Sequence, residues 1–169
     1  HEGYPVRHWD RDLGPASPRL FVREDDRLRP VGTDLADRFD PEEGWHVSPD
    51  GRFALVAVRR PGPRGDQRHA LARVDLGDGS VAMLLDEEGS DHLPGPVSPD
   101  ANRAVVVHTR HSTPEEPPHP RMSVLDLATG TLAPLAPDWD AWPEPVSWSV
   151  DGSAVLALAD LDGRRPVFR

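Results

Sequence analysis

The sequence contains no cysteine and no lysine, and none of its apolar stretches approaches the ~20 residues that a membrane-spanning helix needs. Without cysteine, disulfides, thiolate nucleophiles and zinc sites built on cysteine are excluded. All 19 basic residues are arginine, which we attribute, together with the abundant alanine, proline and glycine, to a GC-rich coding bias. The formal net charge of -10 argues against a nucleic-acid partner, because phosphate contacts need positive patches. We therefore expect a soluble globular protein with neither a membrane nor a nucleic-acid partner.

The length of 169 residues suits one ordinary domain with a sizeable core. We expect a cytoplasmic protein, and the chain carries no signal or transit segment. It begins with His1 rather than methionine and ends within what we predict to be a strand, which suggests a piece excised from a longer protein.

The most informative feature is an internal repeat. Ser48, Ser98 and Ser149 each open a similar turn that is followed by an apolar run, at spacings of 50 and 51 residues. A second landmark, Asp75 and Asp126, recurs 51 residues apart. Because two independent landmarks keep one period, coincidence is an unlikely explanation. A period of about 40 to 50 residues with several strands in each unit is typical of a β-propeller.

Each repeat divides into four predicted strands. A short first strand leads into a Ser-Pro-Asp-Gly turn, in which Pro49 fixes φ and Gly51 is free to be left-handed. In the second copy Ala101 replaces that glycine, and we expect Asn102 to take the left-handed position. The second strand, such as residues 53–58, is continuously apolar, which indicates a strand covered on both faces.

The third and fourth strands of each repeat are joined by an Asp-Leu-x-x-Gly hairpin. Pro134 lies in a fourth strand and cannot donate a ladder hydrogen bond, so we place that strand at the edge of its sheet. No stretch has convincing helical periodicity. We predict an all-β fold, a partial β-propeller of four-stranded antiparallel blades that forms one domain over residues 1–169. Its predicted units are a partial blade (1–40), two blades (41–90 and 91–140) and a second partial blade (141–169).

The repeats, together with residues 4–22, resemble the propeller of prolyl oligopeptidase-family serine peptidases. The likeness is closest to the acylaminoacyl-peptidase and dipeptidyl-peptidase branches. The residues that carry it are Tyr4-Pro5, Trp9-Asp10 and Leu13-Gly14-Pro15, followed by the strand that begins near Leu20. The resemblance covers nearly the whole chain. Its Ser-Pro-Asp-Gly repeat is also found in TolB-like and tricorn-type propellers.

The resemblance implies a propeller that sits over a C-terminal α/β-hydrolase domain of the same polypeptide, restricts access to short peptide substrates and helps to form their site. The sequence has neither a Gly-x-Ser-x-Gly nucleophile elbow nor a His-Gly-Gly oxyanion motif. No catalytic residue is therefore assigned to this chain, and no cofactor is expected. Whether the chain is part of an enzyme depends on the longer protein.

Three other stretches contain residues that could support chemistry. Ser90-Asp91-His92 holds all three triad residue types, but neighbours on an extended chain point to alternate faces, so we interpret it as a loop between blades. Asp160–Gly163 is similar to the start of a calcium loop but lacks the later ligands, and it fits a hairpin turn better. A metal site on a long loop is conceivable; its candidate ligands are His108, His111, His119, Glu115 and Glu116.

Arg59, Arg60 and Arg64 form a basic island in the connection between a second and a third strand. The same connection of the next repeat is rich in histidine, so both should emerge on one face of the propeller. A solvated loop is the simpler interpretation, and the sharper hypothesis is that this face meets the hydrolase domain or peptide carboxylates. Trp139 and Trp142 lie between blades, where core packing is favoured over a substrate-facing wall.

Two other functions remain open. The chain could be a TolB-like propeller that binds a protein or a small ligand and has no enzymatic activity. It could also be a propeller enzyme in its own right, such as a metal-dependent lactonase, although the acidic ligand set that such an enzyme needs at its centre is missing. Trp148, which stands where the earlier repeats have valine, is expected in the core between blades.

Overall fold

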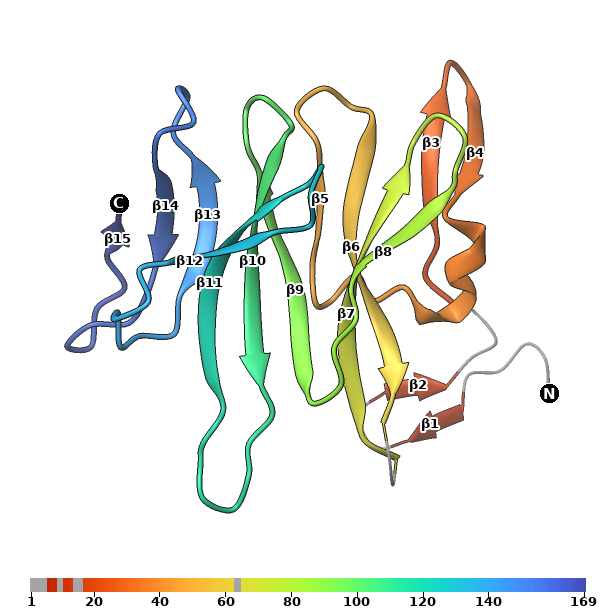
Figure 1. The fold of residues 1–169 in the computed structure, drawn as a ribbon. Helices are drawn as coiled ribbons and strands as arrows, with labels where there is room; N and C mark the ends of the chain where they lie inside the picture. The colour runs from red at the N-terminus through yellow and green to blue at the C-terminus, as the bar shows by residue number, and fades with distance from the viewer. Residues whose placement is uncertain (1–5, 9–10, 14–16, 63–64) are drawn as a thin grey trace.

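The computed structural model describes residues 6–8, 11–13, 17–62 and 65–169, and it is built almost entirely of antiparallel β-sheets placed side by side (Figure 1). Two of these sheets have four strands each. The first contains β5 (Trp45–Val47), β6 (Phe53–Pro61), β7 (Gln67–Asp75) and β8 (Val81–Leu85), hydrogen-bonded in that order. The second contains β9 (Ser90–Val97), β10 (Arg103–Arg110), β11 (His119–Asp126) and β12 (Leu132–Leu135), also in chain order. We call them blade 2 and blade 3.

Smaller sheets flank these two. On one side β3 (Leu20–Glu24) pairs with β4 (Arg27–Val31), and we call this hairpin blade 1. On the other side β13 (Glu144–Trp148), β14 (Val155–Leu158) and β15 (Val167–Phe168) form a three-stranded sheet, blade 4. A separate short pair consists of β1 (Val6–His8) and β2 (Arg11–Leu13).

The strands β6 and β10 alternate their side chains between two neighbouring blades. Ala54, Val56 and Val58 of β6 pack toward blade 1, in a core that includes Val31. Phe53 and Leu55, on the opposite face, pack with Ala104 and Val106 of blade 3. Val105 packs in turn with Val155 of blade 4. This double coverage explains why the second strand of each repeat is apolar without alternation.

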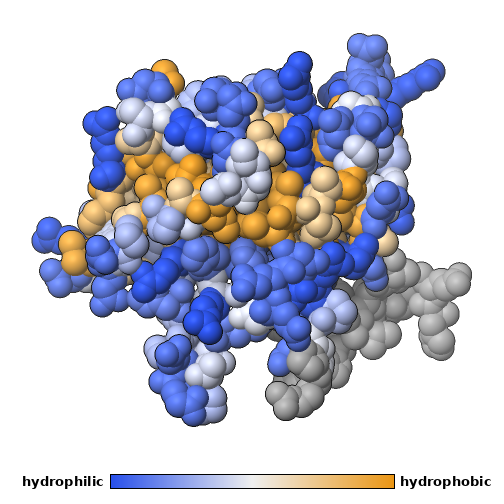
Figure 2. All heavy atoms as spheres, viewed as in Figure 1, coloured by the Kyte–Doolittle hydropathy of each residue, from blue (hydrophilic) through white to orange (hydrophobic). Residues whose placement is uncertain are grey.

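The two edges of the arc are less well covered. Figure 2 shows an apolar band across the middle of the visible surface, with hydrophilic residues on both sides of it. Phe21, Trp45 and Val47 are about half exposed near blade 1, and Val167 is exposed on blade 4. The apolar core between blades is therefore continued at both ends by sheet surface that the described residues leave open to solvent.

The repeated Ser-Pro-Asp-Gly turn is held by its serine and aspartate. The buried Ser48 hydroxyl donates to Asp50 Oδ1 at 2.6 Å and accepts from the amide of Phe53 at 3.1 Å. Ser98 and Ser149 make equivalent contacts in the other copies. Gly51 is left-handed as expected, with φ of 69°.

The prediction for the second turn was wrong. Ala101 itself adopts the left-handed conformation, with φ of 58°, and Asn102 does not. The reason is that the serine hydrogen bonds and the start of β10 fix the turn geometry, so the residue at this position must be left-handed whatever its side chain. The alanine therefore carries backbone strain that the glycines avoid.

Two further expectations need correction. A 3-10 helix, η1 (Thr33–Arg38), lies between β4 and β5, where no helix was predicted. It is too short for a periodic pattern, and Ala36 interrupts it with φ of 51°. Ser90–His92 was interpreted as a loop, but these residues begin β9 and pair with residues 108–110 of β10. Pro134 does lie on β12, an edge strand, as expected.

The long connections and the tight turns lie on opposite sides of the arc. The connection between β6 and β7, described at residues 62 and 65–66, and the connections 86–89 and 111–118 lie at the lower side in Figure 1, and we call this side the loop face. The Ser-Pro-Asp-Gly turns and the Asp-Leu-x-x-Gly hairpins lie at the upper side, the turn face. Because blades 2 and 3 each have four antiparallel strands, the chain enters and leaves each of them on the loop face.

Candidate functional site

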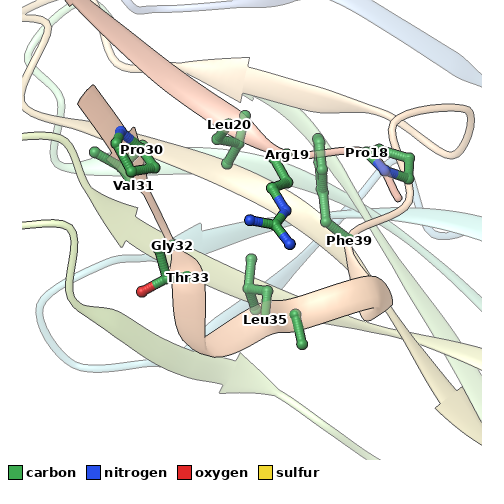
Figure 3. Close-up of a pocket in the computed structure, with 10 residues that line it drawn as sticks. Pro18, Arg19, Leu20, Pro30, Val31, Gly32, Thr33, Leu35 and Phe39 are labelled. Atoms are coloured by element: carbon green, nitrogen blue, oxygen red, sulfur yellow. The ribbon is translucent and has the colours of Figure 1, made fainter. Parts of the chain in front are cut away.

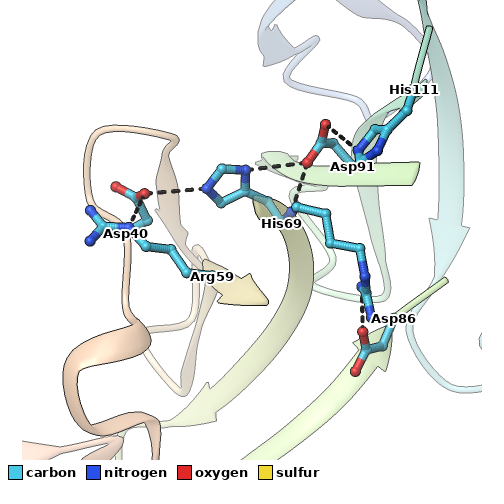
Figure 4. Close-up of polar contacts among 7 residues, drawn as sticks. Asp40, Arg59, His69, Asp86, Asp91 and His111 are labelled. Carbon is cyan, nitrogen blue, oxygen red and sulfur yellow. Dashed lines mark hydrogen bonds and ion pairs between the residues drawn. The ribbon is translucent and has the colours of Figure 1, made fainter. Parts of the chain in front are cut away.

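The most developed polar cluster of the described residues lies at the ends of the strands nearest the loop face. It joins three parts of the chain (Figure 4). Asp40 follows η1, Arg59 and His69 belong to β6 and β7, and Asp91 belongs to β9. His111 directly follows β10. We call these five residues the histidine–aspartate cluster.

His69 is at the centre of the cluster. Its Nδ1 lies 3.3 Å from Asp91 Oδ1 and its Nε2 lies 3.2 Å from Asp40 Oδ2. The backbone amide of His69 also donates to Asp91 Oδ1, at 2.7 Å. Arg59 Nε donates to Asp40 Oδ2 at 2.6 Å, and His111 Nε2 lies 3.1 Å from Asp91 Oδ2. The imidazole of His69 thus lies between two carboxylates that come from different parts of the chain.

The cluster is largely shielded from solvent. Only 7% of the Asp40 side chain and 16% of the His69 side chain are exposed. The hydrogen bond to Asp91 raises the pKa of His69, against the effect of burial, and the contact with Asp40 acts in the same direction. Burial would raise the pKa of Asp40, but the hydrogen bond and charge of Arg59 lower it overall. The pKa of Asp91 is lowered in the same way, because contacts with His69 outweigh its burial. Both carboxylates are therefore charged at neutral pH.

A second ionic group lies beside the first. Arg60 Nη2 is 2.7 Å from Asp86 Oδ2, and Arg68 Nη1 is 2.5 Å from Asp86 Oδ1. These contacts tie β6 and β7 to the connection that follows β8. One carboxylate thus holds two largely buried guanidinium groups.

Arg59, Arg60 and Arg64 were expected to form a basic island on one face of the propeller. Arg59 and Arg60 do lie next to the loop face, but each guanidinium is ion-paired with an aspartate of the same chain. Arg64 lies outside the described residues. The two described arginines therefore act first as links between segments.

The expected tryptophan positions differ in environment. Trp139 packs on Phe168, with ring centroids 4.8 Å apart, and against the core between blades 3 and 4. Trp142, by contrast, is 67% exposed, so the expectation that it packs in the core was wrong. Trp148 is half-buried, and its Nε1 donates to the carbonyl of Pro96 in blade 3 at 2.8 Å, which agrees with its expected position between blades.

The histidines considered as metal ligands are dispersed. His111 contacts Asp91, whereas His108 pairs across the sheet with His92 at a ring-centroid distance of 6.4 Å. Within residues 6–8, 11–13, 17–62 and 65–169, no group of three or more histidine, aspartate or glutamate side chains is placed to hold a metal ion. Asp160–Gly163 forms a hairpin turn closed by a bridge between Leu161 and Arg164.

Sequence reasoning missed Asp40, His69 and the role of Asp91, because Asp40 and Asp91 lie 29 and 22 positions from His69 along the chain. The available signal was the repeat frame itself. His69 is the third residue of β7, a third strand, and Asp91 is the second residue of β9, a first strand, so both had to lie at the same end of neighbouring blades. The polar beginnings of these two strands, ahead of their apolar parts, are the feature that would have connected them.

Two pockets of the described residues differ in size and position. A pocket of about 150 Å³ lies between blade 1 and η1, lined by Leu20, Val31, Leu35 and Phe39 among others (Figure 3). It is smaller than the ~300–1,000 Å³ typical of ligand pockets. A shallower hollow of about 390 Å³ lies on the loop face, between Pro61, Arg68 and His111. Of these two, the hollow on the loop face is the better candidate for contact with a peptide.

Comparison with known proteins gives a consistent result. The chain is 27% identical, over an aligned length of 195 residues, to the probable dipeptidyl-peptidase 5 of Aspergillus niger. The match covers 96% of this chain and 27% of that protein. A structure from a study of two prolyl endopeptidases superposes with a TM-score of 0.54 at 12% identity, over 98% of this chain and 26% of that one. The resemblance to the prolyl oligopeptidase family is confirmed.

The all-β propeller architecture is confirmed as well, since the structure from the study of prolyl endopeptidases has the same fold over 98% of this chain. The acylaminoacyl peptidase of Pyrococcus horikoshii also matches, with a TM-score of 0.49 at 16% identity over 76% of this chain and 18% of that one. No family model matches the chain. The chain spans only about a quarter of the length of the curated relative, 27%. Of the helices in the described residues, none is long and apolar enough to cross a membrane.

Proposed function

We propose that this chain is the non-catalytic β-propeller portion of a serine peptidase that hydrolyses oligopeptides. In this proposal its loop face lies against an α/β-hydrolase domain of the same polypeptide, limits the access of peptides and helps to form their site. The similarity to a probable dipeptidyl-peptidase over 96% of the chain supports the peptidase assignment. The catalytic serine, histidine and aspartate would belong to the hydrolase domain.

The observation that carries the orientation is the path of the chain. Blades 2 and 3 begin and end on the loop face, because an even number of antiparallel strands returns the chain to its starting side. A domain joined to either end of such a propeller is therefore attached on the loop face. The irregular connections 86–89 and 111–118 also lie on that face, whereas the turn face carries tight turns and hairpins.

The test uses the full-length protein and two charge substitutions. Glu115→Arg changes an exposed residue of the 111–118 connection, and Val150→Arg changes a residue that is 98% exposed on the turn face. We expect Glu115→Arg to change kcat/KM for an oligopeptide by about threefold or more, since it alters charge at the domain interface. The matched Val150→Arg variant should leave kcat/KM unchanged.

Labelling with a fluorophosphonate, which reacts with activated serines, tests the peptidase assignment separately. Stoichiometric labelling of the full-length protein is expected, together with hydrolysis of the peptide. Absence of both would contradict the assignment. Equal effects of Glu115→Arg and Val150→Arg on kcat/KM would instead contradict the orientation.

A further inference from the structure

The geometry around His69 has a direct chemical consequence. A neutral imidazole carries a single N–H, whereas a carboxylate only accepts hydrogen bonds. Both ring nitrogens of His69 lie 3.2 to 3.3 Å from a carboxylate oxygen. Only the doubly protonated imidazolium can donate to both. In either neutral tautomer, one nitrogen lone pair would face a carboxylate oxygen.

The two carboxylates belong to segments that must stay together for the arc to hold its shape. Asp40 is fixed to blade 2 by its backbone, since its amide donates to the carbonyl of Ala57 at 3.0 Å. Asp91 lies on β9, the first strand of blade 3. His69 therefore links blade 2, the segment that enters it and blade 3 through one side chain.

Other charged groups around His69 favour a cation there. Glu43, in the segment before β5, adds a favourable charge interaction. Arg59 offsets part of the Asp40 charge, and His111 shares Asp91. Along β7 and β6, Arg68 and Arg60 share the carboxylate of Asp86, which neutralises one of their two positive charges. On β9 the neighbouring His92 is buried, and burial lowers its pKa, which leaves it neutral at neutral pH.

We infer that His69 is a proton-operated clasp between blades 2 and 3. With both ring protons present, the imidazolium donates to Asp40 and Asp91 and holds the loop-face ends of β7 and β9 together. When the ring gives one proton to solvent, one of these two hydrogen bonds is lost, and the remaining lone pair and carboxylate repel each other. The blades then separate more readily at this end.

The pH range follows from the direction of each shift. Because the pKa of His69 is raised in the folded protein, its stabilising contribution is complete below the ordinary histidine pKa and is lost as pH rises through the raised value. The pKa values of Asp40 and Asp91 are lowered, so their contribution is lost only under strongly acidic conditions. The clasp is therefore closed in mildly acidic solution and opens as the solution becomes alkaline.

The clasp lies beside the hollow between Pro61, Arg68 and His111, so its opening would alter the spacing of the residues that line this hollow. An effect on peptide access would rest on the proposed function. The clasp itself does not, because it concerns only the contact between two blades. Its test therefore needs no peptidase activity.

The experiment measures two kinds of hydrogen exchange in the full-length protein by mass spectrometry. Exchange of the imidazole C2 hydrogen against pH gives the pKa of each histidine, and we expect that of His69 to lie above the ordinary value of about 6.5. The substitution Asp91→Asn should lower the pKa of His69, because it removes the charge of the hydrogen-bond acceptor. Amide exchange, corrected for its intrinsic pH dependence, should show protection at the start of β9 that falls about threefold or more between about pH 6 and pH 8.5.

The variant His69→Gln should remove that pH dependence, since glutamine does not titrate. His46→Gln is the matched control: His46 is also half-buried, its pKa is lowered by burial alone, and its loss should leave the pH dependence of β9 intact. If the wild-type pKa of His69 lies at or below the ordinary value, the clasp does not exist, whether or not the variants fold. Protection at β9 that is independent of pH in the wild type would also overturn it.

Discussion

Ala101 occupies a position where the other two turns have glycine, and its left-handed conformation is unfavourable for any residue with a Cβ. We predict that Ala101→Gly raises the free energy of unfolding by about 0.5–1 kcal/mol, because relief of the left-handed strain exceeds the entropy that glycine costs. Urea denaturation of the propeller transition would measure the change.

The matched control is Gly51→Ala in the first turn, where a Cβ would meet no atom within 4 Å but φ is 69°. It should lower the free energy of unfolding by about 1 kcal/mol, since it introduces the same strain without a steric clash. If both substitutions change stability in the same direction, backbone strain does not explain the difference between the turns.

Some features of single residues could be predicted from the sequence, and others could not. The serine of each turn was recognisable, because Ser48, Ser98 and Ser149 share a position in the period. The left-handed residue was assigned to Asn102 from its intrinsic preference, and the surrounding hydrogen bonds overrode that preference. The partners of His69 could not be predicted from its neighbours, since the contacts depend on how adjacent blades are placed.

Among the elements, β6, β7 and the connection after β8 are held at the loop face by Asp86. We predict that Asp86→Asn lowers the free energy of unfolding by about 1–3 kcal/mol at neutral pH, since Arg60 and Arg68 lose a charged partner while they remain largely buried. Burial would raise the pKa of Asp86, but the hydrogen bond from Arg68 and the charges of both arginines lower it. Its contribution is thus present above the ordinary aspartate pKa and is lost as pH falls through the lowered value.

The difference in stability between the wild type and Asp86→Asn should therefore shrink on strong acidification, which urea denaturation at a series of pH values would show. Asp26→Asn provides the control, because the Arg23–Asp26 pair is exposed on both sides and such pairs contribute little. A difference that stays constant down to acidic pH would show that the charge of Asp86 is not what stabilises this connection.

The order and burial of the strands were the features most readily predicted from the sequence. The apolar runs of β6 and β10 indicated strands covered on both faces, and the repeat period placed each of them in its sheet. The 3-10 helix η1 was not predictable, because six residues with a left-handed break at Ala36 leave no periodic signal. Its position depends on contacts of Leu35 and Phe39 with blade 2 rather than on local propensity.

For the whole molecule, the two ends of the arc determine how the chain behaves alone. Near blade 1, Phe21, Trp45 and Val47 are about half exposed, and together they line an apolar hollow of about 440 Å³. At blade 4, Trp139 and Phe168 line another of about 460 Å³. Exposed apolar sheet surfaces favour association because contact with a second copy removes them from water. Open strand edges favour it because their unpaired backbone groups can hydrogen-bond to another strand.

We therefore predict that the 169-residue chain expressed alone self-associates, whereas a longer protein of the kind proposed above, in which further blades would cover these surfaces, does not. Light scattering coupled to size-exclusion chromatography would measure the mass. Val47→Asp and Val167→Asp, one at each end, should each reduce the association, since an open chain of copies needs both surfaces. Val150→Asp, on the turn face, should not. A monodisperse monomer that melts cooperatively would show instead that the arc is stable with its ends uncovered, as a solenoid is, and that closure of a ring is not needed for its folding.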